Sequence, residues 1–176
     1  GRALAKADPG NAVWKRDTGV GWNKIGDVQA ASGDLTSALQ SYEQALAIAR
    51  DYAKSVPGNL EGRRDLTVTL DKIGDTKWKA GDTTGSLDAY EESLDISREL
   101  AAADRNNVTW QTDLVVRLYK LAELSDGDKR KEAVQEALTI VDRLEAEGKL
   151  SPDKKNWKDL LLALRAPSSP QPAAQQ

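Results

Sequence analysis

The chain contains no cysteine and no histidine. Their absence removes the commonest zinc ligands, every cysteine nucleophile and every catalytic pair in which histidine activates a serine or cysteine. Long apolar runs are also missing: none approaches the roughly 18 residues that a membrane-spanning helix needs, and no signal-peptide pattern is present. These absences favour a soluble chain that is not an enzyme and has no cofactor, metal or membrane anchor.

A surplus of positive charge is also lacking. The 176 residues include 25 Lys and Arg against 28 Asp and Glu, which gives a net charge of −3. Because phosphate binding needs a clustered basic surface, this balance argues against nucleic acid as the main ligand. With 39% hydrophobic residues, the chain is long enough to bury a sizeable core.

One stretch of the sequence occurs twice. Residues 22–48 recur at 70–96, and the residues that reappear 48 positions later include Ile25, Gly26, Asp27, Gly33, Asp34, Leu39, Tyr42, Glu43, Leu46 and Ile48. Self-similarity at a fixed period of this size indicates a stacked array, because one unit alone cannot bury its apolar face.

Turn residues recur at the same period. Pro9-Gly10-Asn11 returns as Pro57-Gly58-Asn59 and, in altered form, as 105–107. Proline ends a helix, glycine permits a turn, and asparagine can cap the next helix. The spacing predicts three helical hairpins whose first helices cover about 12–31, 60–79 and 108–124. Gly33-Asp34 and Gly81-Asp82 are the turns within the first two, with glycine ending the first helix and aspartate as the N-cap of the second.

The residues of the unit resemble the tetratricopeptide repeat. The first copy carries the pattern at Trp22, Ile25, Gly26, Gln29, Ala38, Tyr42 and Ala45. The second carries it at Leu70, Ile73, Gly74, Lys77, Ser86, Tyr90 and Ser93, and a weaker third at Leu118, Leu121, Ala122, Ser125, Val134 and Ala137. The 48-residue unit is longer than the family's usual one, which we interpret as an extension of both helices.

The resemblance implies an all-α fold, a right-handed α-solenoid of three antiparallel helical hairpins with a C-terminal capping helix. We expect the following divisions: 1–8, the end of a truncated preceding repeat; 9–55, 56–103 and 104–147, three repeats of which the last is shortened; 148–165, the capping helix; and 166–176, a disordered tail. Arg2, Ala5 and Lys6 match Arg50, Ala53 and Lys54 at the same offset, which together with the lack of methionine suggests a piece of a longer array.

Two features of the hairpins predict how they pack. Gly26 and Gly74 lie in mid-helix, where glycine costs about 1 kcal/mol relative to alanine, and close approach of an aromatic ring of the second helix would explain the cost. On the second helix we expect a buried stripe, formed by Leu39, Tyr42, Leu46 and Ala49 and then by Leu87, Tyr90, Leu94 and Ser97.

The C-terminal third departs from the repeat. The run Lys129-Arg130-Lys131 follows Asp126-Gly127-Asp128, and we interpret it as a solvated first helical turn. Ser151-Pro152 then predicts a helix start, and the following helix carries one apolar stripe: Trp157, Leu160, Leu161 and Leu164. A helix with a single apolar face suits a cap over the last hairpin.

Aligned acids do not form a catalytic site. Asp17, Asp65 and Asp113 form one row, but a catalytic carboxylate pair needs a pocket that shifts one pKa. A second row consists of Asp27, Asp75 and Glu123. Each of these acids has a lysine three residues earlier, in the pairs Lys24-Asp27, Lys72-Asp75 and Lys120-Glu123. We therefore expect neither enzymatic activity nor a catalytic, cofactor or metal site.

The family resemblance places a binding groove on the first helices. The positions that would face it are Asn23, Lys24 and Asp27, then Asp71, Lys72, Asp75, Trp78 and Lys79, then Tyr119, Lys120 and Glu123. Members of the family that bind chaperone tails clamp a terminal carboxylate with Lys, Arg and Asn at such places, whereas here every rung also carries an acid.

Two functions fit this sequence. The first is a protein–protein interaction scaffold whose groove docks a peptide or partner segment, as part of a larger multidomain protein; long repeats of this kind resemble those of bacterial signalling proteins. The second is a structural array that acts as a spacer or self-associates through an uncovered first repeat. The partner in either case is a protein or peptide, and a cytoplasmic location is favoured over export.

Overall fold

The computed structural model describes residues 12–55 and 58–165, which form two compact units divided between Asp104 and Arg105. Every regular element among these residues is a helix, and no strand occurs among them. The expected segments at 1–8 and 166–176 lie outside the described residues, as do the connector at 9–11 and Pro57. The predicted all-α array of helical hairpins with a C-terminal helix is confirmed, whereas its handedness stays a prediction.

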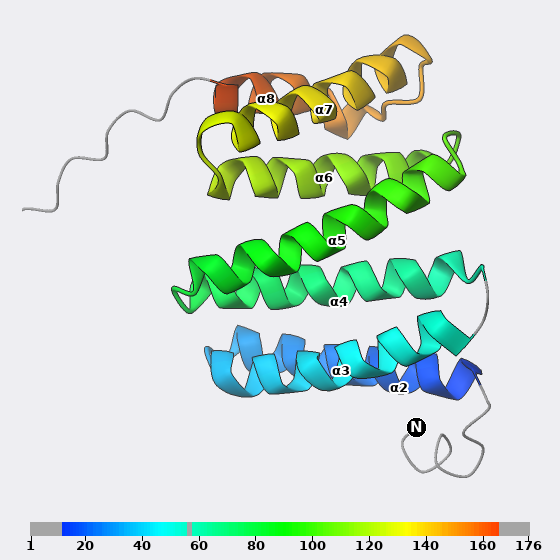
Figure 1. Cartoon of the computed structure of the whole chain (residues 1–176), viewed down its shortest axis with the longest axis vertical. Helices are drawn as coiled ribbons and strands as arrows, with labels where there is room; N and C mark the ends of the chain where they lie inside the picture. The colour runs from blue at the N-terminus through cyan, green and yellow to red at the C-terminus, as the bar shows by residue number, and fades with distance from the viewer. Residues whose placement is uncertain (1–11, 56–57, 166–176) are drawn as a thin grey trace, which may run out of the picture. The chain divides into compact units, whose positions relative to one another are not determined.

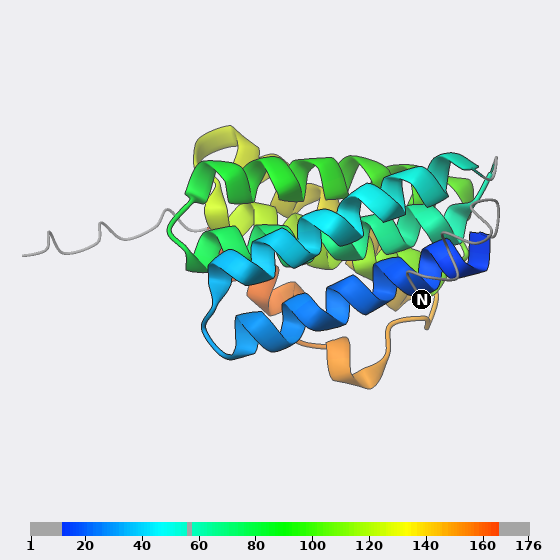
Figure 2. The same cartoon turned by 90° about the horizontal axis from the view of Figure 1, so that it is seen from below.

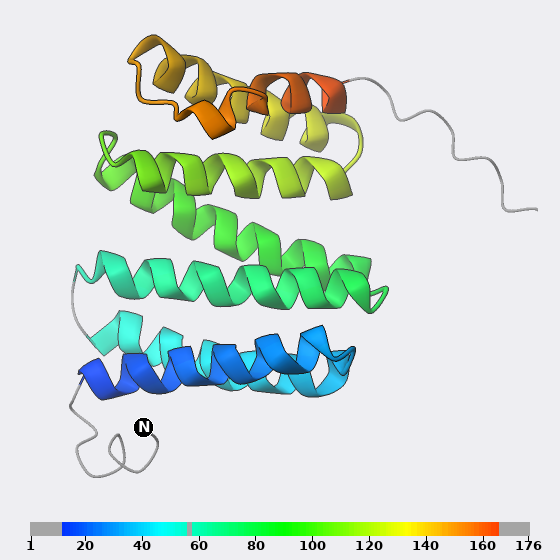
Figure 3. The same cartoon turned by 180° about the vertical axis from the view of Figure 1, so that it is seen from behind.

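The first unit consists of two antiparallel hairpins. α2 (Ala12–Ala31) pairs with α3 (Leu35–Ser55), and α4 (Leu60–Lys79) pairs with α5 (Thr83–Ala103). α3 packs on α4 and so joins the hairpins (Figure 1), while α2 and α4 lie side by side on one face of the unit (Figure 3). The bounds of α2 and α4 agree with the predicted 12–31 and 60–79.

The turns within these hairpins follow from glycine and aspartate. Gly33 and Gly81 have φ of 87° and 83°, in the left-handed region where glycine carries no Cβ penalty. Asp34 then accepts a hydrogen bond from the Ser37 N–H at 3.0 Å, and Asp82 accepts one from the Gly85 N–H at 2.9 Å. Both N-caps were predicted, and they start α3 and α5 where the sequence indicated.

Asparagine caps two first helices in the same way. The Asn59 side chain accepts from the Gly62 N–H at 2.8 Å, and the Asn107 side chain accepts from the Trp110 N–H at 3.2 Å. These contacts fix the starts of α4 and α6, since each satisfies a backbone donor that has no partner within its helix.

The mid-helix glycines lie against tyrosine rings, as predicted. A Cβ on Gly26 would be 2.5 Å from Cε1 of Tyr42, and a Cβ on Gly74 would be 2.7 Å from Cε1 of Tyr90. Neither distance leaves room for a methyl group. The absent side chain therefore lets each ring lie on the backbone of its first helix, and the tyrosine hydroxyl reaches the aspartate that follows the glycine, Asp27 or Asp75.

The buried stripe of α3 is centred slightly differently from the prediction. Ala38, Tyr42, Ala45 and Ala49 are buried, whereas Leu39 and Leu46 are partly exposed and pack against the margin of the core. On α5 the predicted Tyr90, Leu94 and Ser97 are buried and Leu87 is partly exposed. The helices approach so closely that small side chains, more than leucines, form the centre of the contact.

The second unit is one hairpin with added helices. α6 (Val108–Leu124) pairs with α7 (Gly127–Ala146), and a 3₁₀ turn (Pro152–Lys154) leads to α8 (Trp157–Arg165). α6 has the predicted bounds. α8 packs on α7 and also contacts α6, with Leu161 1% exposed.

The predicted capping helix is shorter than expected. Pro152 begins a 3₁₀ turn and α8 starts only at Trp157, while Ser151 makes no side-chain cap hydrogen bond. Proline at a first helical position suits a 3₁₀ turn as well as an α-helix, so its signal did not separate the two. Leu160 is 44% exposed, so the four stripe residues are not buried alike.

The basic run at the start of α7 is only partly solvated. Lys131 is exposed and pairs with Asp128 at 3.0 Å, as expected of a surface turn. Arg130 instead reaches back over the turn, where its Nε donates to the carbonyl oxygens of Ala122 at 3.0 Å and Ser125 at 2.8 Å. It thereby satisfies carbonyl groups at the end of α6, so the interpretation of Arg130 as a solvated residue was wrong.

Candidate functional site

A hollow of about 230 Å³ opens between α2 and α4 in the first unit. Its walls come from Arg16, Gly19, Val20, Asn23, Lys24 and Asp27 of α2 and from Asp65, Val68, Thr69 and Lys72 of α4, and its floor comes from Ala45, Ala49 and Tyr52 of α3. We call this hollow the α2–α4 groove. Two of the floor residues, Ala45 and Ala49, are small and leave space between the two helices.

Three polar contacts join its walls. Arg16 Nε pairs with Asp65 Oδ2 at 2.5 Å, and Lys72 Nζ pairs with Asp27 Oδ1 at 2.5 Å. Between them, Asn23 Nδ2 donates to Thr69 Oγ1 at 2.9 Å. Exposed ion pairs contribute only about 0 to 1 kcal/mol each, so their main effect here is to hold charged groups at fixed places along the groove.

Asp27 also links the groove to the core of its hairpin. The same Oδ1 that meets Lys72 accepts a hydrogen bond from the Tyr42 hydroxyl at 2.8 Å, and Lys72 Nζ lies 5.9 Å from the centre of the Tyr42 ring. Burial and this donation to Asp27 raise the pKa of Tyr42 well above its usual value. The hydroxyl therefore stays protonated and keeps Asp27 in place.

The Asn23 side chain has one unused acceptor. Thr69 Oγ1 donates its own proton to the Asp65 carbonyl at 3.1 Å, so it can only accept from Asn23, and the amide must turn its nitrogen toward Thr69. The amide oxygen, Asn23 Oδ1, is then buried without a hydrogen-bond partner among the described residues. Such an atom is uncommon in a folded protein and calls for a physical explanation.

The structure brings four of the predicted groove residues together. Asn23, Lys24, Asp27 and Lys72 all line the α2–α4 groove. Among the described residues Asp27 pairs across the helices with Lys72 and not with Lys24, contrary to the expected pairing along one helix. The contact depends on how two helices lie together, which spacing along one helix does not reveal.

Other predicted residues on α4 lie elsewhere. Asp71 accepts from Ser93 Oγ at 2.7 Å, and Asp75 accepts from the Tyr90 hydroxyl, so both face the second helix of their own hairpin. Trp78 and Lys79 are exposed at the end of α4 and do not line the groove.

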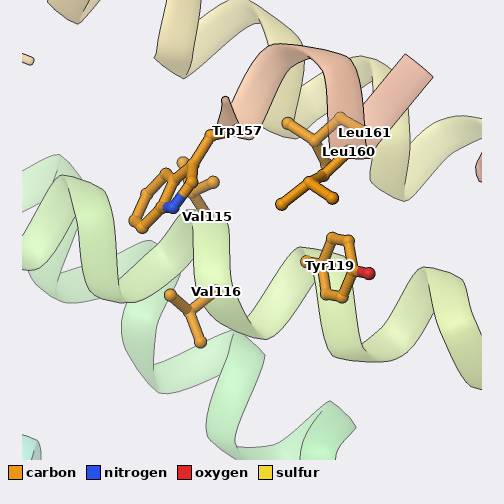
Figure 4. A pocket seen from close by; sticks show the side chains of 6 residues that line it. All are labelled: Val115, Val116, Tyr119, Trp157, Leu160 and Leu161. Atoms are coloured by element: carbon orange, nitrogen blue, oxygen red, sulfur yellow. The ribbon is translucent and has the colours of Figure 1, made fainter. Parts of the chain in front are cut away.

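The predicted residues on α6 belong to the second unit. Tyr119 lines an apolar hollow of about 120 Å³ between α6 and α8, together with Val115, Val116, Trp157, Leu160 and Leu161 (Figure 4). Burial and donation to Glu123 raise the pKa of Tyr119 above its usual value. Lys120 follows on the same helix and is partly exposed.

Several groove residues were not singled out from the sequence. Arg16, Val20 and Val68 line the groove beside the predicted residues. Arg16, Val20, Asn23 and Asp27 follow the i, i+4, i+7, i+11 spacing of one helix face, so extending that face by two turns would have found the first two.

The first hairpin matches a known family. The tetratricopeptide repeat family matches the chain over residues 21–52, which span the second half of α2 and most of α3. Residues 21–52 form a tetratricopeptide repeat. This repeat is in general a non-catalytic module of protein–protein interaction. The match does not establish the repeat length, so the 48-residue type stays a prediction. A comparison with curated proteins found no match.

Two further findings concern other kinds of site. No helix among residues 12–55 and 58–165 has the length and apolar character needed to cross a membrane. Within the same ranges, no group of three or more acidic side chains is arranged to hold a metal ion. The residues that line the α2–α4 groove supply hydrogen-bonding groups, charges and apolar surface.

Proposed function

We propose that the chain is a protein–protein interaction scaffold whose α2–α4 groove docks an extended peptide or partner segment. The observation that carries this proposal is the buried, unpartnered Asn23 Oδ1 in the wall of the groove. A peptide backbone supplies N–H donors at regular intervals, and one of them would satisfy this acceptor once the Asn23 side chain turned its oxygen into the groove. The remaining groove surface combines the apolar Val20 and Val68 with charged groups at its rim.

The charges of the groove indicate which segment it prefers. Asp65 and Asp27 are each engaged by a cation of the opposite wall, whereas Lys24 is exposed at the rim. An incoming segment would therefore meet the positive charge of Lys24 beside the Asn23 amide. We infer that the docked segment carries an acidic side chain at this point and an apolar residue over Val20 and Val68.

The wider setting is inferred from resemblance alone. Long repeats of this type resemble those of bacterial signalling proteins, in which an effector domain lies elsewhere in the chain. We place the α2–α4 groove as a docking module within such a multidomain protein.

A structural array is the second candidate. It is favoured by the bridges Arg16–Asp65 and Lys72–Asp27, because both tie consecutive hairpins together and would do so without any ligand. In a pure spacer the groove would bind nothing, and its residues would affect only stability.

Selection from a displayed library of random peptides separates the two candidates. The folded chain is used as bait, and enriched peptides are tested against Asn23→Leu and Lys24→Glu. We expect both variants to lose binding by about tenfold or more, since loss of a charged or buried hydrogen-bonding group costs about 1.4 kcal/mol or more. Lys155→Glu, on an exposed site in the second unit, should bind like the unchanged chain.

Two outcomes would contradict the docking proposal. One is the absence of any enriched peptide, and the other is enrichment of peptides that bind Asn23→Leu and Lys24→Glu unchanged. Trp78→Ala adds a further test, because reduced binding would show that the segment extends past the groove to the end of α4.

A further inference from the structure

A second surface of α2 is apolar and exposed. Ile25 is 47% exposed and Val28 is 71% exposed, and the two lie three residues apart on one face of the helix. Seen from below, α2 and α3 are the helices of the first unit that lie in front of α4 (Figure 2). The face carrying Ile25 and Val28 points away from the α2–α4 groove, and we call it the outer face of α2.

The internal repeat shows what this face looks like when it is covered. The residues 48 positions later on α4 are Ile73 and Thr76, which are 5% and 3% exposed. They are covered because α3 of the preceding hairpin packs on α4. Ile73 belongs to one buried cluster with Ala38 and Tyr42 of α3. The same face of the same kind of helix is thus buried in one copy and exposed in the other.

The outer face of α2 is not adapted to water. Where the covered helix has Thr76, the exposed helix has Val28, so the exposed copy is the more apolar of the two. The end of a helical-repeat array usually carries a polar outer face, because an apolar one promotes association. Here valine stands at position 28 where the covered helix has threonine, so the exposed face is more apolar and not more polar.

We propose that the outer face of α2 docks the second helix of another hairpin of the same kind, in the way that α3 docks on α4. The occupant would supply the small and aromatic face that α3 offers at Ala38, Tyr42 and Ala49. One sequence match favours an occupant of this kind: Arg2, Ala5 and Lys6 repeat Arg50, Ala53 and Lys54 of α3 at the 48-residue offset. The proposal does not depend on the α2–α4 groove.

A peptide with the sequence of residues 34–55 tests this proposal on the chain as it stands. A fluorescent label on the peptide reports binding by anisotropy. We expect saturable binding that Ile25→Asp and Val28→Asp each weaken by about tenfold or more, because a buried carboxylate would replace an apolar contact. A Tyr42→Ala change within the peptide should weaken binding as well.

Matched controls assign the contact to the outer face. Val116→Asp changes an exposed valine of α6 and should leave binding unchanged, and Lys24→Glu, which impairs the groove, should also leave it unchanged. Because Ile25 and Val28 are exposed, both aspartate variants should keep the helical circular-dichroism spectrum of the unchanged chain, which excludes misfolding as the cause of lost binding.

Three results would overturn the proposal. The first is no saturable binding of the peptide, and the second is binding that Ile25→Asp and Val28→Asp leave intact. The third comes from sedimentation without peptide: a dimer that Val28→Asp dissociates would show that a second copy of the chain, and not an α3-type helix, covers the face. That result would support the self-association expected from the sequence.

Discussion

The hairpins of the two units differ at the contact between a small residue in the middle of the first helix and the side chain of the second helix that faces it. In α4–α5 the Tyr90 ring lies on Gly74, its hydroxyl donates to Asp75, and Ser86 Oγ donates to the Gly74 carbonyl at 2.9 Å. In α6–α7 the corresponding places hold Ala122 and Val134, both fully buried. The first contact gains a hydrogen bond from a tyrosine hydroxyl, whereas the second has an aliphatic side chain in its place and keeps one hydrogen bond to the backbone, from Arg130 Nε to the Ala122 carbonyl at 3.0 Å.

This difference explains where glycine is required. A tyrosine lying flat on the first helix leaves no room for a Cβ, whereas a valine does not reach as far and tolerates alanine. The tyrosine hydroxyl then positions the aspartate that follows the glycine, and in the first hairpin that aspartate is Asp27 of the α2–α4 groove. In the α6–α7 hairpin Val134 has no hydroxyl to make such a link, and α8 packs on both of its helices.

The largest expected effect tests that cover. Leu161→Ala removes a side chain that is 1% exposed and should lower the free energy of unfolding of the second unit by about 2 to 5 kcal/mol. Leu160→Ala is the matched control, because its side chain is 44% exposed and should matter much less. Denaturant unfolding of both variants measures the difference. Equal losses would show that α8 does not close the second unit through Leu161.

Gly74→Ala should cause the next largest loss of stability. The added methyl group would lie 2.7 Å from Cε1 of Tyr90, and overpacking of this kind costs about 1 to 3 kcal/mol. In a chain that already carries Tyr90→Val, the same substitution should instead be neutral or stabilising, because alanine favours a helix over glycine by about 1 kcal/mol. Thermal melts of the four chains give the coupling, and additive effects would mean that the ring does not require the glycine.

Tyr90→Phe should have an intermediate effect. It removes one hydrogen bond to a carboxylate and should cost about 1 kcal/mol near neutral pH. Burial and donation to Asp75 raise the pKa of Tyr90 above its usual value. The protonated hydroxyl therefore stabilises the fold fully below the unfolded tyrosine pKa, and this stabilisation is lost as the pH rises toward the folded one. Unfolding midpoints measured across the alkaline range should fall less steeply in Tyr42→Phe/Tyr90→Phe.

The smallest effect compares two helix starts. Asp82→Ala removes the cap hydrogen bond to the Gly85 N–H and should cost about 1 kcal/mol. Asp126 precedes α7 without a side-chain cap hydrogen bond, so Asp126→Ala should cost clearly less. Chemical unfolding of the two variants gives both values. A larger loss for Asp126→Ala would reverse the expected order.

Local and repeated signals in the sequence predicted most of the fold. The glycines at 33 and 81, the caps Asp34 and Asp82, and the Gly26–Tyr42 contact each follow from one residue type at a position that recurs 48 residues later. Such features depend on short stretches of chain, and the second copy confirms the first. For this reason the bounds of the first helices were predicted correctly.

The features that sequence reasoning missed depend on contacts between helices. The partner of Asp27 is Lys72, 45 residues away, because α2 and α4 lie side by side. Arg130 turns back toward the end of α6 because its long side chain can span the connecting turn. The buried Asn23 Oδ1 likewise results from where Thr69 places its proton. Residue spacing along one helix cannot predict these contacts between helices. It did predict that Asn23 faces the groove.

Chemical-shift mapping tests the central claim most directly. The isotopically labelled chain would be titrated with the tightest peptide from the displayed library. If the α2–α4 groove is the docking site, the largest amide shifts will lie at the groove residues Val20, Asn23, Lys24, Val68 and Lys72, with little change on α6 and α8. Shifts concentrated at the hollow between α6 and α8, or at Ile25 and Val28 on the outer face of α2, would contradict it.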